Sequence, residues 1–142
     1  MKNLVILTGL LVSHLAFSEG KPLKHIHELV WQNRVILILS DNNDDIYVQS
    51  LNKYSEQIQD RDIMWFILKD RDVVTNYKGP LSSEFIGLTK SNYPIEADKV
   101  LLIGKDGGIK AQQHKLNLDF IFGNVDSMPM RKAEMREKTS SN

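Results

Sequence analysis

Hydrophobic residues gather in three uninterrupted runs, at residues 35–39, 63–68 and 100–103. Short apolar runs without polar alternation are typical of strands whose two faces are both covered, as in a parallel sheet. We therefore expect these runs to form three central β-strands.

Between the first two runs the pattern changes to a helical period. Four large apolar side chains at i, i+4, i+7 and i+11 share one helical stripe: Tyr47, Leu51, Tyr54 and Ile58. Asp44 or Asp45 can cap this helix, because a short carboxylate accepts hydrogen bonds from the free N–H groups of the first turn. A strand–helix–strand unit has a right-handed crossover, so its two strands should be parallel.

A polar stretch at residues 69–79 follows the second run. Pro80 and Ser82 can then open a shorter helix that carries apolar residues 85, 86 and 88. Residues 92–98 are expected to form a loop before the third strand.

The segment after the third run predicts a hairpin and two helices. Residues 105–108 read Lys-Asp-Gly-Gly, and glycines tolerate the positive φ angles of tight turns, so residues 109–113 should return as an antiparallel strand. Asn117 can cap a helix with apolar positions at i, i+3, i+4 and i+7. A last helix is expected over residues 130–137, and residues 139–142 should form a disordered tail.

The element order is therefore β-α-β-α-β-β-α, with two parallel crossover steps followed by a hairpin and a closing helix. This order predicts an α/β, thioredoxin-like fold with a central mixed sheet and helices on both faces. Residues 21–31 precede the first strand and fit either a short helix or an edge strand.

The first eighteen residues read as a secretory signal, with Lys2 before an apolar run at residues 4–17 and small residues near Ser18. A membrane anchor is the alternative, but Ser13 and His14 interrupt a run that is already shorter than the roughly 20 residues needed to span a membrane. We expect cleavage after Ser18, a domain over residues 19–138, a periplasmic or secreted location and no stable membrane anchor.

The amino-acid composition excludes several classes of function. The chain has no cysteine, which excludes thiol redox chemistry, thiolate metal sites and cysteine nucleophiles. Removal of Lys2 with the signal leaves 17 basic and 18 acidic side chains, a formal charge of −1. This balance argues against nucleic acid as a partner, because nucleic-acid binding needs a concentrated positive face.

The turn after the first strand is the main candidate for chemistry, because thioredoxin-like folds carry their cysteines there. It reads Ser-Asp-Asn-Asn-Asp-Asp at residues 40–45. Such a turn can be a solvated helix cap, a contact site for a partner or a cation site, although it lacks the glycine and distal glutamate of an EF-hand. We assign no metal and no cofactor. The tentative ligand-binding residues are Arg34, Asp41, Asn43, Asp44 and Arg131.

Three other groups of residues have competing interpretations. The basic residues 131, 132, 136 and 138 alternate with Glu134 and Glu137, which favours a solvated helix in which Arg131 and Glu134 pair on the exposed side. The nearby methionines 128, 130 and 135 could fill the core or form an adaptable partner-binding surface. His25 and His27 would share one face of an extended segment, and two histidines alone are a weak zinc signal.

Three motifs carry a resemblance to a known family: Trp31-x-Asn33-Arg34, the segment 102–110 around the hairpin, and Asp126-x-Met128-Pro129-Met130-Arg131-x-x-Glu134-Met135. Together they resemble domain-of-unknown-function family 4174, which is thioredoxin-like. Its members include short exported bacterial proteins and domains of vertebrate coiled-coil-domain-containing and sushi-repeat matrix proteins. The resemblance implies a thioredoxin-like fold and secretion, and it assigns no catalytic residue.

These observations favour a non-catalytic module that binds an envelope or extracellular protein or glycan. One alternative is a cysteine-independent enzyme, in which Arg34, Asp41, Asp44 and Asp70 would have to converge around a pocket. Another is a redox or stress accessory protein of the cell envelope that keeps the thioredoxin shape for client contact.

Overall fold

The computed structural model describes residues 20–41 and 44–142, so the expected signal at residues 1–18 and the candidate Asn43 lie outside the described residues. The elements, in chain order, are η1 (Ile26–Leu29), β1 (Arg34–Leu39), α1 (Asp44–Lys53), α2 (Ser55–Asp60), β2 (Ile63–Leu68), β3 (Val73–Thr75), α3 (Phe85–Asn92), β4 (Val100–Ile103), β5 (Ile109–Gln113), α4 (Leu118–Ser127) and α5 (Pro129–Ser140).

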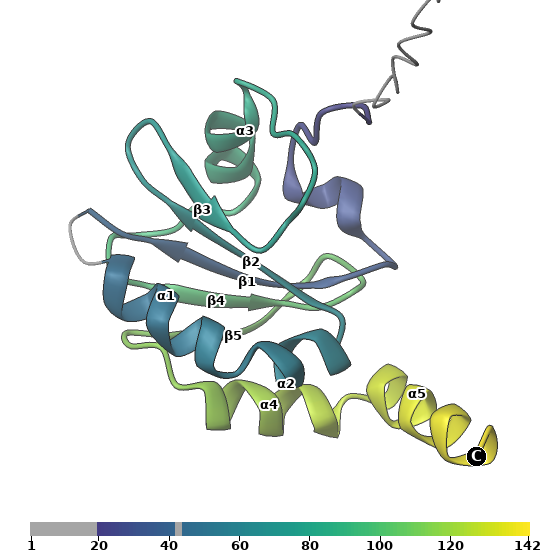
Figure 1. Cartoon of the computed structure of the whole chain (residues 1–142). Helices are drawn as coiled ribbons and strands as arrows, with labels where there is room; N and C mark the ends of the chain where they lie inside the picture. The colour runs from purple at the N-terminus through teal and green to yellow at the C-terminus, as the bar shows by residue number, and fades with distance from the viewer. Residues whose placement is uncertain (1–19, 42–43) are drawn as a thin grey trace, which may run out of the picture.

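The five strands form one mixed sheet in the order β3-β2-β1-β4-β5. β1 and β2 are parallel, and the other neighbouring strands are antiparallel. We call the end where β1 and β2 begin the amino end of the sheet, and the end where they finish the carboxyl end. In Figure 1, α1 starts at the carboxyl end, whereas α5 lies at the amino end.

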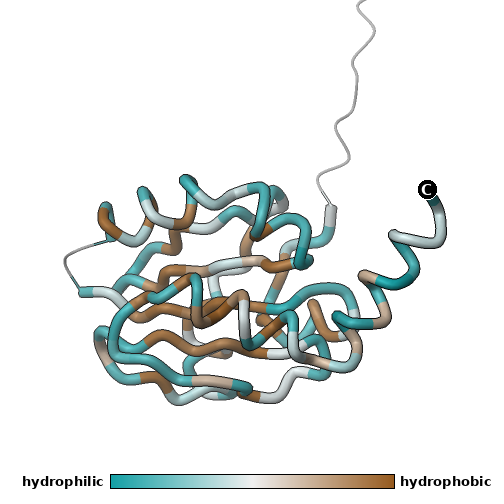
Figure 2. Tube along the Cα trace, turned by 90° about the horizontal axis from the view of Figure 1, so that it is seen from below, coloured by the Kyte–Doolittle hydropathy of each residue, from teal (hydrophilic) through white to brown (hydrophobic). Residues whose placement is uncertain are grey.

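Both faces of the sheet are covered, which explains why the strand sequences are apolar without alternation. One face packs against α1, α2 and α4 through Ile36, Trp65 and their neighbours. The other face packs against η1 and α3 through Leu37, Phe66 and Phe85. The hydrophobic parts of the chain therefore gather in the middle of the body, whereas α5 is mostly hydrophilic or neutral (Figure 2).

Several predictions from the pattern are confirmed. The three apolar runs form β1, β2 and β4, and the first crossover places β1 parallel to β2. The hairpin joins β4 to β5, and Gly107 has a φ of 82°. Asn117 caps α4 by accepting a 3.0 Å hydrogen bond from the N–H of Phe120. The fold is α/β and thioredoxin-like, with helices on both faces of a mixed sheet.

One predicted strand direction is wrong. β4 runs antiparallel to β1, because the segment expected to be a polar loop contains the extra strand β3 (Val73–Thr75). β3 returns the chain to the amino end, so the connection through α3 delivers β4 from the carboxyl end. The side chains of β3 are only half buried, which is why its hydrophobic signal is weak.

The helix boundaries also differ from the pattern. The predicted first helix is two helices that break at Tyr54, whose φ is −106°, although Leu51 and Ile58 remain buried on the same face. The segment before β1 combines the short helix η1 with a single parallel bridge between Leu23 and Leu81. α5 continues to Ser140, beyond the expected end. Among the described residues, no helix is both long and apolar enough to span a bilayer.

Replacing either of two glycines by alanine tests this fold, because one replacement should lower the free energy of unfolding and the other should raise it. Gly107 has a left-handed φ, and an added Cβ would lie 3.1 Å from Val30 Cγ2, so Gly107→Ala should lower the free energy of unfolding by about 1–2 kcal/mol. Gly123 lies inside α4 with open space around its Cα, so Gly123→Ala should raise stability by up to about 1 kcal/mol. Urea denaturation of both variants measures the difference; equal effects would contradict the hairpin geometry.

Candidate functional site

The structure divides the predicted site residues between opposite ends of the sheet. Asp41 and Asp44 lie at the carboxyl end, after β1 and at the start of α1. Arg34 opens β1 at the amino end, and Arg131 belongs to α5 beside it. β1 has six residues, which span about 17 Å, so the two groups do not form one site.

The shortest ion pair at the carboxyl end joins Asp44 to Lys69, and the longer pairs Asp70–Arg71 at 3.9 Å and Glu96–Lys99 at 3.5 Å also lie there. The Lys69 ammonium lies 3.0 Å from Asp44, and its hydrogen bond holds the pKa of that carboxyl below the usual value. Asp41 is exposed, and the Asp70 side chain is 98% exposed. Within residues 20–41 and 44–142 no group of three or more acidic or imidazole side chains is placed to hold a metal ion. The convergence that the enzyme hypothesis requires is therefore not present among Arg34, Asp41, Asp44 and Asp70.

The amino end is built around a buried arginine. Arg34 is 1% exposed, and its two terminal nitrogens donate to the two Glu134 oxygens, each at 3.2 Å. Arg34 Nη1 also donates to the carbonyl of Arg61 at 2.9 Å. A two-pronged contact of this kind fixes both the distance and the orientation of the partner. Arg34 thus ties the start of the central strand to α5.

Lys105 extends this contact to the β4–β5 hairpin. Its ammonium lies 2.7 Å from Glu134 and 2.9 Å from Asp62. Burial raises the pKa of Glu134, but the hydrogen bonds from Arg34 and Lys105 outweigh it, so the net pKa is lowered. Glu134 is therefore ionised and shared by two cations.

A second part of the network surrounds Arg131, which is 3% exposed. Its guanidinium contacts Asp60 at 2.5 Å and Asp126 at 3.3 Å. Lys138 lies 2.7 Å from Asp60, and Arg61 lies 2.8 Å from Asp126. Hydrogen bonds from Lys138 and Arg131 lower the pKa of Asp60 to about 2.

Burial raises the pKa of Asp126, but the hydrogen bonds from Arg61 and Arg131 produce a net lowering. We call the whole set the amino-end network. It joins five cations to four carboxylates: Arg34, Arg61, Lys105, Arg131 and Lys138 with Asp60, Asp62, Asp126 and Glu134.

The sequence expectation for α5 is corrected in part here. Arg131 and Glu134 do pair, at 3.8 Å, but on the side that faces the body and not on the exposed side. Together with Lys138 they form a stripe at i, i+3 and i+7 that pairs with the body, whereas most other residues of the helix are exposed as expected. Sequence reasoning missed Lys105 and Arg61 as members of the network, although Lys105 stands in a motif that carries the family resemblance.

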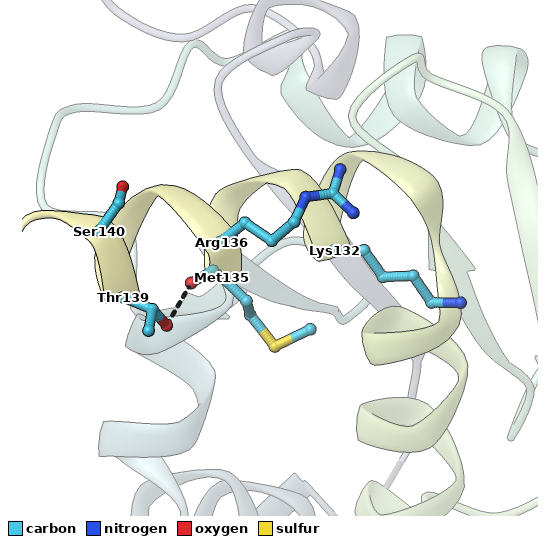
Figure 3. A pocket seen from close by; sticks show the side chains of 5 residues that line it. All are labelled: Lys132, Met135, Arg136, Thr139 and Ser140. Carbon is cyan, nitrogen blue, oxygen red and sulfur yellow. Dashed lines mark hydrogen bonds between the residues drawn. The ribbon is translucent and has the colours of Figure 1, made fainter.

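The outer side of α5 carries the remaining basic residues. Figure 3 shows Lys132, Met135, Arg136 and Thr139 along this side, with Thr139 Oγ1 donating to the carbonyl of Met135 at 3.0 Å. Of the three methionines, Met128 packs against the core, whereas Met130 is 40% exposed. Core filling therefore describes the first methionine and not the second.

The two histidines lie at η1 and not on an extended segment. His25 precedes the helix and His27 lies within it, with their rings stacked 6.1 Å apart. The nearby Tyr93 hydroxyl donates to the carbonyl of Gly107 at 2.7 Å, and burial raises the pKa of this phenol. This contact fixes the hairpin to α3.

Trp31 is the most exposed large hydrophobic side chain among the described residues, at 66%. It lies in the turn before β1 and has a left-handed φ of 69°. Its backbone N–H donates to the carbonyl of Lys105 at 2.6 Å, so the turn is held against the hairpin. Bulky residues rarely adopt this conformation, which costs on the order of 1–3 kcal/mol and is often found at functional positions.

The buried ion pair between Arg34 and Glu134 predicts a large loss of stability when its carboxylate is replaced by an amide. Glu134→Gln leaves the Arg34 charge buried without a carboxylate, so we expect a loss of about 3 kcal/mol in the free energy of unfolding. Glu137→Gln is the control, because this exposed neighbour on α5 forms no ion pair among the described residues; it should change stability by less than about 0.5 kcal/mol. Urea denaturation of both variants at neutral pH gives the comparison.

The lowered carboxyl pKa values predict acid sensitivity. Asp60, Asp126 and Glu134 have lower pKa values in the folded protein than in the unfolded chain. Their contribution to the free energy of unfolding is therefore complete above about pH 4.5 and is lost as the pH falls towards about 2. Asp60→Asn should lower the melting temperature at neutral pH and reduce its fall in acid. Asp70→Asn should follow the wild type. Thermal unfolding from pH 7 to 2 measures both; parallel curves for wild type and Asp60→Asn would contradict the network.

Comparison with known proteins identifies the family. The model of the domain-of-unknown-function family DUF4174 matches residues 25–134. No curated protein matches the chain. The solved structure of the mitochondrial 2-cys peroxiredoxin from Plasmodium falciparum is similar, with 16% sequence identity over 72% of this chain and 79% of that chain, and a TM-score of 0.46. Because the family model spans most of the sequence, this protein belongs to the DUF4174 family of domains of unknown function.

Proposed function

We propose that this protein is an exported, non-catalytic binding module that attaches to a protein or glycan of the cell envelope or the exterior. Export rests on the sequence of residues 1–18, with the charged Lys2 before an apolar run. The absence of cysteine leaves no thiol for the chemistry of thioredoxin-like enzymes.

The wide separation of the candidate charged residues supports the proposal that the protein is not a catalyst. Acid–base or nucleophilic catalysis needs several groups within hydrogen-bond reach of one substrate position. Asp41 and Asp70 are exposed at the carboxyl end, whereas Arg34 is buried at the amino end and paired with Glu134. The cations of the amino-end network are thus engaged in structural pairs.

The exposure of Trp31 is the main support for the proposal that this protein binds a partner. An exposed tryptophan offers a large, rigid contact area, and tryptophan is enriched among residues that dominate binding energy. Here the backbone hydrogen bond of 2.6 Å to Lys105 holds the main chain of this residue in its left-handed conformation before any ligand arrives. Such preorganisation lowers the entropic cost of binding. The amino end around Trp31 is therefore the proposed binding surface.

Co-sedimentation with envelope material from the source cells tests this function. The mature chain from Glu19 should be found in the envelope or the medium, and the purified chain should sediment with the envelope material. Trp31→Ala should weaken retention about tenfold, because it removes the central contact. Ile46→Ala is the control, since Ile46 is 62% exposed on α1 at the other end, and it should bind like the wild type.

Three outcomes would contradict the proposal. They are no retention of the wild type, equal loss in both variants, or catalytic turnover of small molecules by the purified chain. A precursor that keeps residues 1–18 inside the cell would contradict export separately from binding.

A further inference from the structure

A hollow of about 390 Å³ opens at the amino end, between α2, the start of β2 and the segment after β3. Its volume is within the range of about 300–1,000 Å³ that is usual for small-molecule sites. Its polar lining consists of short amide and hydroxyl side chains with one acid and one base: Asn33, Ser55, Gln59, Asn76, Asp62 and Lys78.

The lining contains fixed groups and available groups. Asn76 is held by two backbone contacts, accepting from Trp65 N–H at 2.8 Å and donating to the Ile63 carbonyl at 3.3 Å. Among residues 20–41 and 44–142, the side chains of Gln59 and Lys78 make no hydrogen bond or ion pair with another residue. The hollow therefore offers hydrogen-bonding groups to a ligand at Gln59 and Lys78, next to the fixed side chain of Asn76.

The backbone of Trp31 lies next to this hollow, although Trp31 is not itself one of the lining residues. It is two residues from Asn33, so the two Cα atoms are at most about 7 Å apart. Asp62 provides a second link, because it lines the hollow and also binds Lys105, whose carbonyl accepts from the Trp31 N–H. Asp62 has a left-handed φ of 50°, so two of the three non-glycine residues with positive φ among the described residues lie here. Strained conformations of this kind gather at ligand sites.

We propose that Trp31 and this hollow form a carbohydrate-binding site, which rests on the proposed function and names its ligand class. Sugar hydroxyls both donate and accept, so they match an amide-rich lining. The C–H face of a sugar ring packs against the negatively charged face of an exposed indole. The lining carries one acid and one base, a formal charge of zero, and it lacks the cluster of cations that a phosphate would favour. An extended peptide would need a series of apolar pockets for alternate side chains. This lining supplies apolar side chains at two adjacent positions only, Ile63 and Met64.

The test uses envelope polysaccharide from the source cells in three forms: untreated, digested with protease, and oxidised with periodate, which cleaves neighbouring diols. The mature chain should bind the protease-digested material as tightly as the untreated material and lose at least about tenfold in affinity after periodate. Gln59→Ala should bind about fivefold more weakly, because it removes an available amide. Gln112→Ala, an exposed glutamine on β5, is the matched control and should bind like the wild type.

Acrylamide quenching of tryptophan fluorescence gives a readout that needs no variant. The chain has two tryptophans, Trp31 and the buried Trp65, so the accessible signal comes from Trp31. Protease-digested polysaccharide should protect this signal from the quencher. Binding that disappears after protease and survives periodate would overturn the carbohydrate assignment and leave the binding function standing. The absence of binding to any of the three forms would overturn both.

Discussion

The buried guanidinium of Arg34 is the constraint on which the rest of the structure depends. An arginine at 1% exposure at the start of the central strand would cost several kcal/mol if its charge were unpaired. Its carboxylate partner, Glu134, is 100 residues away in the sequence and is also bound by Lys105. The central strand therefore reaches its low-energy state only when the hairpin and α5 have both docked. One ion pair thus couples the beginning, the middle and the end of the domain.

The docking of α5 is ionic, and this determines its properties. Arg131 is the only buried residue of the helix, and its inward stripe is completed by Glu134 and Lys138. Apolar packing tolerates sliding of one helix over another, whereas a bidentate guanidinium–carboxylate contact has a fixed direction and register. The network sets the position of α5 more strictly than a hydrophobic stripe would. It also makes that position sensitive to salt and acid, because exposed members such as Asp60 are screened and can be protonated.

The fold could be predicted from sequence where burial leaves a pattern among neighbouring residues. The apolar runs identified β1, β2 and β4, and the glycines identified the hairpin, because these features depend on neighbouring residues. β3 was missed because its three side chains are only half buried, and the direction of β4 depended on it. The network could not be derived from local spacing, since Arg34 and Glu134 are brought together only by the complete topology. A charged stripe on α5 has the same sequence pattern as a solvated helix, and only the partner positions on β1 and α2 distinguish the two. The candidates Arg34 and Arg131 were thus real members of a cluster, but Asp41 and Asp44 belong to the opposite end.

The two ends of the sheet differ in how they use the positions at which a thioredoxin-like fold can carry function. At the carboxyl end, a cysteine at the start of α1 would be activated by the positive end of the helix, but the carboxylate of Asp44 occupies that position and binds Lys69. The helix end is thus neutralised instead of being used for a nucleophile. At the amino end, the network fixes the hairpin, the turn before β1 and α5 relative to one another, and the strained backbone of Trp31 is held on this rigid frame. Under the proposed binding function, a surface fixed in this way would lose little entropy when a ligand arrives. We therefore expect the amino-end network to matter for the proposed binding as well as for stability, because Lys105 belongs to the network and its carbonyl also holds the backbone of Trp31.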